Sequence, residues 1–243
     1  MLLAIDIGNS QIKGAVFKHN TISDTFIFAY SEWRKKIENI FERYPLLSHL
    51  IVSSVGKLSE DDFLWIDKKI QISFVSRQMK FPFTNLYKTP DTLGVDRMVL
   101  ASGAVLKYPK TNRLVIDAGT AITYDFVDAM DNYLGGAISP GLRLRYKALN
   151  DYTAKLPYLE KTEEDFFIGQ NTSESIHSGV VNGVIHEIEG FIDRYRTTYE
   201  NFIIILTGGD TDFLAKRLKS TIFANQNFLL ESLNDLYQFQ NND

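Results

Sequence analysis

The same short pattern occurs twice in this chain: an apolar strand, a tight turn that opens with Asp-x-Gly, and a second strand in which apolar residues alternate. The first copy comprises the apolar run 2–5, the turn Asp6-Ile7-Gly8-Asn9-Ser10 and a strand to Phe17; the second comprises Leu114–Ile116, the turn Asp117-Ala118-Gly119-Thr120 and the strand Ala121–Val127. Repeated strand-turn-strand units predict two similar lobes, each a sheet covered by helices. We therefore expect an α/β chain with lobes at residues 1–112 and 113–243 and a ligand cleft between them.

The first turn has the chemistry of an anion-binding loop. Gly8 lets backbone N–H groups approach an anion closely, and Asn9 and Ser10 add hydrogen-bond donors. Asp6 would repel a bare phosphate, so we expect it to hold Mg²⁺. Lys13 follows on the second strand and can extend toward phosphate oxygens. Taken alone, the turn fits an ordinary hairpin, with Asn and Ser as turn formers, better than it fits an anion-binding loop.

The second turn changes this balance, because Asp117, Gly119 and Thr120 repeat the same chemistry. Two such turns facing across a cleft would hold a polyphosphate and its metal ion from both sides. The Walker pattern of glycines followed by Gly-Lys-Ser/Thr is absent, and a strand rather than a helix follows each turn. The pair of turns predicts an ATP-using enzyme of another class.

A third candidate segment, Gly94-Val95-Asp96-Arg97, stands at the predicted start of a helix. Asp96 could accept the proton of a hydroxyl that attacks a γ-phosphate, and Arg97 could pair with a substrate carboxylate through two hydrogen bonds. The alternative is that Asp96 is a helix N-terminal acid favoured by the helix dipole.

Two glycine-rich segments are open to two interpretations each. Thr207-Gly208-Gly209-Asp210 follows a buried strand and could support a base or ribose, or be a tight strand-to-helix turn. The connection Leu134–Gly141 could form a pocket wall or only turn a corner.

Apolar periodicity predicts the remaining elements. Strands are expected at Ile51–Val55 and Phe202–Leu206, and helices at Asp61–Lys69, Val95–Lys107, Leu142–Leu149, Ser173–Tyr195, Phe213–Leu218 and Phe228–Phe239, with a frayed tail at 240–243.

Composition excludes several classes of site and partner. A net charge of -4 provides no basic footprint for nucleic acid. There are no cysteines, so disulfides and thiolate chemistry are excluded, and the four histidines are scattered. No apolar run approaches the length of a membrane span, and the first residues lack the basic region of a signal peptide. We expect a cytoplasmic protein with no membrane or nucleic-acid partner.

Seven motifs in order resemble those of the type III pantothenate kinases, which belong to the acetate kinase, sugar kinase and actin superfamily. They are DIGNSQIK at 6–13, YKTPDTLGVDR at 87–97, DAGTAITYD at 117–125, GGAISPG at 135–141, ALNDYTAKLP at 148–157, the segment 172–179 and TGGD at 207–210. The resemblance covers almost the full length. It implies a two-lobed actin-like (ribonuclease H-like) duplicated fold and transfer of the ATP γ-phosphate to pantothenate, the first step of coenzyme A synthesis.

The resemblance also implies roles for individual residues. The first ATP loop would consist of Asp6, Ile7, Gly8, Asn9, Ser10, Gln11, Ile12 and Lys13, with Thr120 contacting ATP from the second turn. Asp96 matches the proton acceptor, and the pantothenate site matches Tyr87, Gly94, Val95, Asp96, Arg97 and Thr172. Asp117 matches the ligand of a monovalent cation, K⁺ or NH₄⁺, needed beside Mg²⁺. The family also implies a homodimer in which the partner chain completes the pantothenate pocket.

Two rival functions follow from the same motifs. Another kinase or a phosphatase of the superfamily would keep both turns, but it would not require Tyr87 followed by Gly94–Arg97. A nucleotide-binding regulatory protein without catalysis would not require Asp96, Arg97 and Lys13.

Overall fold

The computed structural model describes residues 1–56 and 58–241, which group into two compact units. The first unit contains residues 1–110, 130–134 and the segment from Asn227, and the second contains 111–129 and 135–226. The sequence-based lobes differ from these units mainly at the C-terminal helix, which was assigned to the lobe 113–243 and belongs by its contacts to the first unit.

The first unit is built on a five-stranded sheet in the order β3-β2-β1-β4-β5. Its strands are β1 (Leu2–Ile7), β2 (Ile12–Lys18), β3 (Thr21–Phe28), β4 (His49–Ser54) and β5 (Gln71–Phe74). The strands β1, β2 and β3 pair antiparallel, whereas β4 pairs parallel with β1 and with β5. The strands predicted on both sides of the first turn are therefore confirmed.

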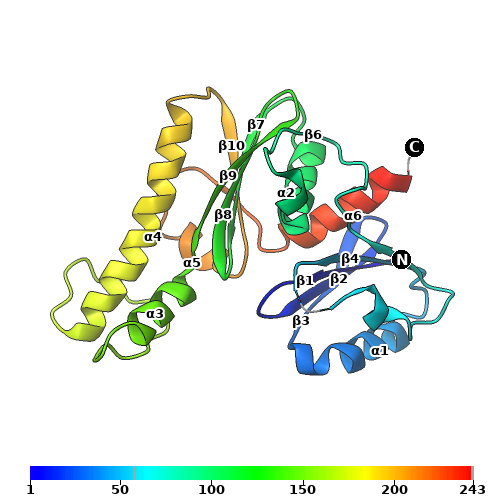
Figure 1. Ribbon diagram of the computed structural model, residues 1–243, viewed down its shortest axis with the longest axis horizontal. Helices are drawn as coiled ribbons and strands as arrows, with labels where there is room; N and C mark the ends of the chain where they lie inside the picture. Colours follow the sequence, from blue (N-terminus) through cyan, green and yellow to red (C-terminus); the bar gives the residue numbers. More distant parts are fainter. Residues whose placement is uncertain (57, 242–243) are drawn as a thin grey trace. The chain divides into compact units, whose positions relative to one another are not determined.

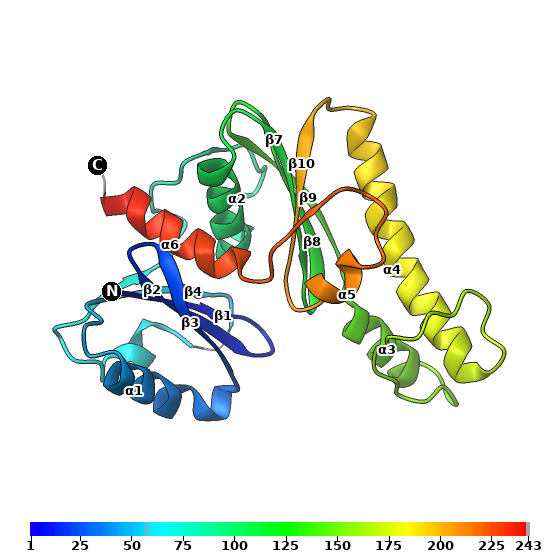
Figure 2. The same ribbon diagram turned by 180° about the vertical axis from the view of Figure 1, so that it is seen from behind.

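Helices cover both faces of this sheet (Figure 1). They are α1 (Trp33–Arg43) on one face and α2 (Val95–Lys107) and α6 (Phe228–Asn241) on the other; short 3-10 turns lie at Tyr30–Glu32, Glu60–Phe63 and Pro90–Thr92, and β6 is Thr84–Asn85. Alternate residues of β1 explain the two layers, because Leu3 and Ile5 pack with α1 while Leu2 and Ala4 pack with α2 and α6. The back view shows α6 crossing α2 (Figure 2).

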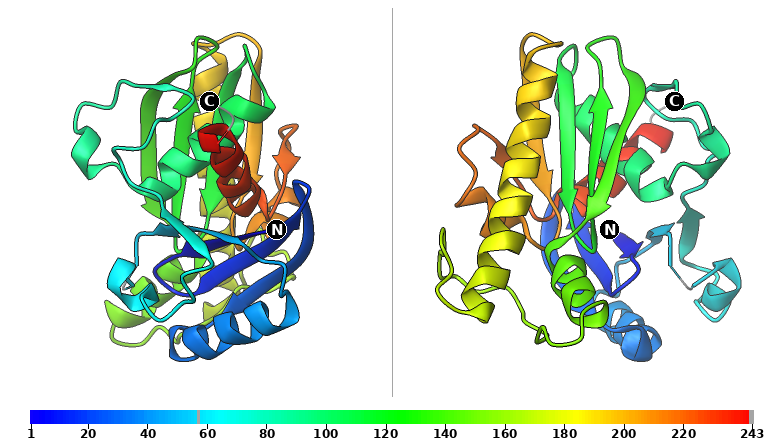
Figure 3. Two further views of the ribbon diagram at one scale, coloured as in Figure 1. Left: turned by 90° about the vertical axis from the view of Figure 1, so that its right-hand side faces the viewer. Right: turned by 60° about the vertical axis from the view of Figure 1, so that its left-hand side comes forward.

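The second unit repeats the strand-turn-strand device. Its elements are β7 (Asn112–Ala118), β8 (Ala121–Val127), β9 (Asn132–Pro140, of which residues 132–134 group with the first unit), α3 (Leu142–Asp151), α4 (Thr172–Arg196), β10 (Phe202–Thr207), α5 (Thr211–Ala215) and β11 (Phe223–Ala224). The sheet order is β11-β10-β7-β8-β9-β6, with β7 antiparallel to β8 and parallel to β10. The long helix α4 runs along this sheet (Figure 3), and its residues Ile176, Val184 and Ile192 pack on strand residues such as Leu114 and Tyr124.

Three sequence-based assignments need correction. The segment Asp61–Lys69 is not a helix: it forms a short 3-10 turn, Glu60–Phe63, followed by further turns. The Asp67 carboxylate accepts the N–H of Lys69, a local hydrogen bond that competes with helical pairing. The connection Leu134–Gly141 is mostly strand β9, and the helix expected at Phe213–Leu218 is the shorter α5. The expected tail is helical through Asn241, and residues 242 and 243 lie outside the described part of the chain.

Candidate functional site

The first turn joins two strands at the top of a hairpin whose register places Asp6 opposite Lys13. Side chains directly opposite one another in an antiparallel pair lie on the same face of the sheet, so the side chains of Asp6 and Lys13 are neighbours. Ile7 and Ile12 are fully buried and anchor the turn. Residues 9–11, at the tip, are exposed to solvent.

Two side chains near this turn were not found from the sequence. The hydroxyl of Tyr30 donates to the carbonyl of Gly8 at 2.5 Å, which braces the turn from outside the motif. Ser53 lies opposite Asp6 on β4, is fully buried, and has no hydrogen-bond partner for its hydroxyl within residues 1–56 and 58–241. Only tertiary pairing places these residues at the turn, so no local pattern could have identified them.

The second turn is also a hairpin but a shorter one, because β7 and β8 pair Asp117 opposite Thr123 whereas β1 and β2 pair Asp6 opposite Lys13. The N–H of Gly119 donates to the carbonyl of Ala121 at 3.0 Å and closes the turn. The predicted residues Asp117 and Thr120 therefore lie in one hairpin, at positions equivalent to Asp6 and Asn9.

Both glycine-rich segments pack against this second turn. Gly208 has φ of 99°, and a side chain there would overlap the Asp117 carboxylate, while the N–H of Asp210 donates to the Ala118 carbonyl at 3.0 Å. From the other segment, the N–H of Gly141 donates to the Thr120 carbonyl at 3.0 Å. The turn is thus supported by two segments that are distant from it in sequence.

The third candidate segment begins helix α2, with Gly94 as its N-cap. One carboxylate oxygen of Asp96 accepts the N–H of Arg97 at 2.8 Å. Burial raises the pKa of Asp96 above its ordinary value of 3.8, although the Arg97 amide and charge act in the opposite direction. A carboxylate held in this way binds a proton more readily than an exposed one.

Arg97 and Tyr87 come together beside Asp96. Arg97 is only 6% exposed, and its guanidinium lies 5.8 Å from the centre of the Tyr87 ring. Tyr87 is fixed by a hydrogen bond from its N–H to the Asn85 side chain at 3.0 Å. Val95 instead packs into the core, so any substrate contact from this residue would come from its backbone.

The site residues divide between the two units. The segment Asp6–Lys13, Tyr87 and Gly94–Arg97 belong to the first unit, and Asp117, Thr120 and Thr172 belong to the second. Thr172 is exposed in the first turn of α4, which is capped by Asn171 accepting the N–H of Glu174 at 3.0 Å.

The donor sets at both turns suit hard cations. Asp6 contributes a carboxylate beside the Ser53 hydroxyl, and Asp117 contributes a carboxylate beside backbone carbonyls of its own turn. Over the described ranges, no three His, Asp or Glu side chains gather as a closed metal site. Mg²⁺ characteristically binds through one or two carboxylates and completes its shell with phosphate oxygens and water, so single carboxylates fit it.

Comparison with known proteins gives consistent matches. The sequence model of the family described as type III pantothenate kinase matches residues 2–194. A type III pantothenate kinase of Flavobacterium johnsoniae is 57% identical over 240 residues, covering 99% of this chain and 98% of the relative. Another from Flavobacterium psychrophilum is 58% identical over 240 residues, covering 99% and 100%.

A solved structure supports the architecture. A protein described as an N-acetylmannosamine kinase from Listeria monocytogenes superposes with a TM-score of 0.58 at 14% identity, covering 98% of this chain and 99% of that one. At this identity the likeness concerns the fold alone. In addition, each helix of the described ranges is too short or too polar to cross a bilayer.

Proposed function

The chain belongs to the type III pantothenate kinase family, and from this premise we propose that Asp96 accepts the proton of the substrate hydroxyl during phosphoryl transfer. The protein uses ATP to phosphorylate pantothenate to 4'-phosphopantothenate, the first step of coenzyme A biosynthesis. The family resemblance and the two-lobed actin-like (ribonuclease H-like) fold expected from the motifs are confirmed.

The observation that carries the proposal is the position of Asp96 at the start of α2, directly beside Arg97, whose guanidinium lies near the Tyr87 ring. Burial also raises the pKa of the Asp96 carboxyl. As the hydroxyl oxygen of pantothenate bonds to the γ-phosphorus, its proton passes to the Asp96 carboxylate. The bond between the γ-phosphorus and the β–γ bridging oxygen breaks, and ADP leaves with that oxygen. A base whose pKa lies closer to the working pH drives this transfer better than an ordinary aspartate.

The two turns supply the ATP contacts in this proposal. Backbone and side-chain donors of Asp6–Lys13 would bind the ATP phosphates, and Thr120 would be a further ATP contact. Asp6 would hold Mg²⁺, which offsets phosphate charge when bound. Lys13, opposite Asp6 in the hairpin, adds a positive charge near the transferred group.

For pantothenate, we assign the carboxylate to Arg97. Its planar guanidinium can donate two parallel hydrogen bonds to a carboxylate. Tyr87 lies against that guanidinium and limits its rotation. Gly94 and the Val95 backbone would line the same end of the substrate.

We further propose a homodimer in which Thr172 contributes to the partner's pantothenate pocket. Large apolar side chains are exposed in the segment that leads into α4, including Tyr152 at 88%, Phe167 at 80% and Ile168 at 76%. No neighbouring atom of the described residues lies within 4 Å of the position that a Cβ would take at Gly179. The surface of α4 at Gly179 therefore has room for another chain. Exposed apolar groups of this kind characterise association surfaces.

Cytoplasmic location and the lack of nucleic-acid or membrane partners stay predictions.

The role of Asp117 gives a prediction about salts. With ATP, Mg²⁺ and pantothenate present, product formation should fall several-fold when K⁺ is replaced by Na⁺ at constant ionic strength, because a smaller ion fits the same oxygens poorly. Asp117→Asn should be slow in both salts and should abolish this difference. The measurement is the initial rate of ADP release.

Asp151→Asn is the matched control, because Asp151 is an exposed carboxylate of the same unit that forms an ion pair with Lys147. It should keep the wild-type preference for K⁺. Equal rates in K⁺ and Na⁺ for the wild type would remove the cation from Asp117.

A further inference from the structure

The second phosphate turn depends on residues 139–141 for its backbone position. The N–H of Gly141 donates to the Thr120 carbonyl at 3.0 Å, and a side chain at position 141 would overlap the carbonyls of Gly119 and Thr120. A shift of this segment would therefore shift Thr120.

One carboxylate on helix α4 holds that segment in place. One oxygen of Glu187 accepts hydrogen bonds from the Ser139 hydroxyl at 2.5 Å and from the Tyr124 hydroxyl at 3.0 Å. Its other oxygen accepts from the Arg145 guanidinium at 2.5 Å, and Arg145 also donates to the Pro140 carbonyl at 2.8 Å. Both residues that precede Gly141 are thus tied to Glu187, one directly and one through Arg145.

The charges within this cluster favour the ionised carboxylate. Burial alone would raise the pKa of Glu187, but the hydrogen bonds from Ser139, Arg145 and Tyr124 outweigh it and leave the pKa lowered. Burial and the neighbouring Glu187 charge raise the pKa of Tyr124, which keeps its hydroxyl a donor. The side chains of Arg145 and Glu187 are 22% and 24% exposed, so water screens their pairing only in part.

We propose that Glu187 is a positioning residue for ATP: through Ser139 and Arg145 it fixes Pro140 and Gly141, and through Gly141 it fixes Thr120. This inference rests on the ATP contact proposed for Thr120. It implies that loss of the carboxylate weakens ATP binding while leaving the pantothenate residues of the first unit, Tyr87 and Gly94–Arg97, unchanged.

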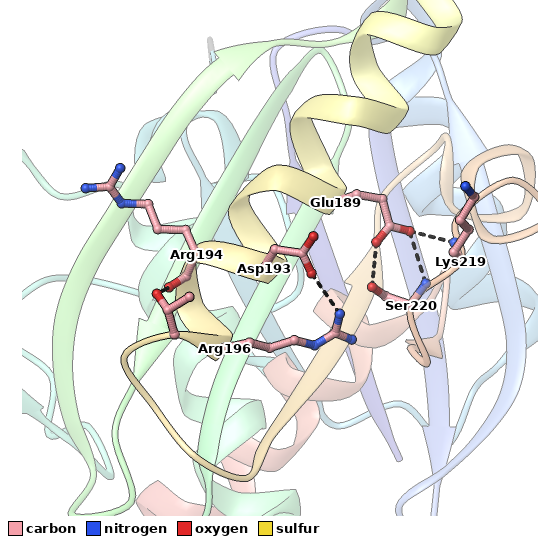
Figure 4. Close-up of polar contacts among 7 residues, drawn as sticks. Glu189, Asp193, Arg194, Arg196, Lys219 and Ser220 are labelled. Carbon is pink, nitrogen blue, oxygen red and sulfur yellow. Dashed lines mark hydrogen bonds and ion pairs between the residues drawn. The ribbon is translucent and has the colours of Figure 1, made fainter.

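Glu189 on the same helix is a matched control. It accepts hydrogen bonds from the N–H of Lys219 at 2.5 Å, the N–H of Ser220 at 3.0 Å and the hydroxyl of Ser220 at 2.5 Å (Figure 4). Like Glu187, it makes three short hydrogen bonds and is partly buried. These partners lie in the loop after α5, outside the second turn and outside residues 139–141.

The experiment compares Glu187→Gln with Glu189→Gln in the full-length protein. Glu187→Gln should raise both the ATP dissociation constant, measured by calorimetry with MgATP, and the KM for ATP by about 3- to 30-fold. The KM for pantothenate should stay within about twofold of wild type, as should kcat at saturating ATP. Glu189→Gln should show a similar fall in melting temperature with no change in ATP affinity.

A smaller change, Ser139→Ala, removes one hydroxyl of the same chain of contacts and should weaken ATP binding in the same direction; it replaces Glu187→Gln if that variant does not fold. Unchanged ATP affinity in both variants, or equal weakening in Glu189→Gln, overturns the proposal. Thr120→Ala tests the ATP contact of Thr120 separately from the positioning role of Glu187. If Thr120→Ala leaves the ATP affinity unchanged, the proposed ATP contact is wrong, and the positioning role of Glu187 is wrong with it. If Thr120→Ala weakens binding and Glu187→Gln does not, only the inference fails.

Discussion

Asp96→Asn should lower kcat by about 10²- to 10⁴-fold, the usual contribution of a general base. The amide cannot take the hydroxyl proton, yet its oxygen can still accept the N–H of Arg97, so the local structure is retained. ATP affinity measured by calorimetry should stay within about twofold of wild type, because Asp96 is placed at the acceptor hydroxyl and not at the phosphates. Turnover close to wild type would remove Asp96 from this role.

The pKa direction adds two checks to this variant. Since the folded pKa of Asp96 lies above its unfolded value, the ionised carboxylate disfavours the folded state at neutral pH, and this effect disappears as the pH falls below the unfolded pKa. Asp96→Asn should therefore melt at the same temperature as wild type or higher at pH 7. In the wild type, the rate should fall on the acid side with an apparent pKa above 3.8, as Asp96 becomes protonated. Asp91→Asn, an exposed acid in the same segment, should match wild type in every measurement.

Arg97→Gln should raise the KM for pantothenate by about 10- to 100-fold, the range expected when a charge-assisted hydrogen bond to a carboxylate is lost. The KM for ATP should change less than about threefold. Arg97→Lys should recover only part of the loss, because an ammonium keeps the charge but not the paired donor geometry. Steady-state kinetics with each substrate varied in turn makes the distinction.

Arg34→Gln serves as the control for this series, since Arg34 is an exposed arginine of the same unit that forms an ion pair with Glu38. It should leave both KM values unchanged. An Arg97→Gln enzyme with a normal KM for pantothenate would contradict the assignment of the carboxylate.

The parts of the fold that the sequence could predict are those with strong local signals. The hairpins around Asp6 and Asp117 have buried strands and short turns, and helix α2 extends over Val95–Lys107 as its apolar spacing and the later Pro109 indicate. The two-lobed fold was predictable because the sequences of the two hairpins are similar. These signals are local, so a single sequence is enough to detect them.

The parts that failed depended on tertiary context. The segment Asp61–Lys69 has helical apolar spacing, but its backbone forms successive turns closed by hydrogen bonds between residues three positions apart. These turns bury Phe63 and Ile66 in the core and leave Leu64 80% exposed. In β9, the glycines lower strand propensity, yet the neighbouring strands and the fully buried Tyr133 hold it extended.

The residues of the candidate site likewise divide into those with a local sequence signal and those placed only by tertiary contacts. The motif residues Asp6, Asp96 and Asp117 are detectable in sequence because each lies in a recognisable turn or helix start. Tyr30 and Glu187 are not detectable in this way, because Tyr30 contacts the first turn, and Glu187 contacts the segment that supports the second turn, only in the folded chain. Residues that support a site from outside its motifs therefore require a structure.

The kinase activity can be measured directly with both substrates present. Purified protein incubated with ATP, Mg²⁺, K⁺ and pantothenate should form 4'-phosphopantothenate, identified by its mass, in an amount equal to the ADP released. ADP release that does not require pantothenate, or the absence of phosphopantothenate from folded protein that binds ATP, would contradict the account.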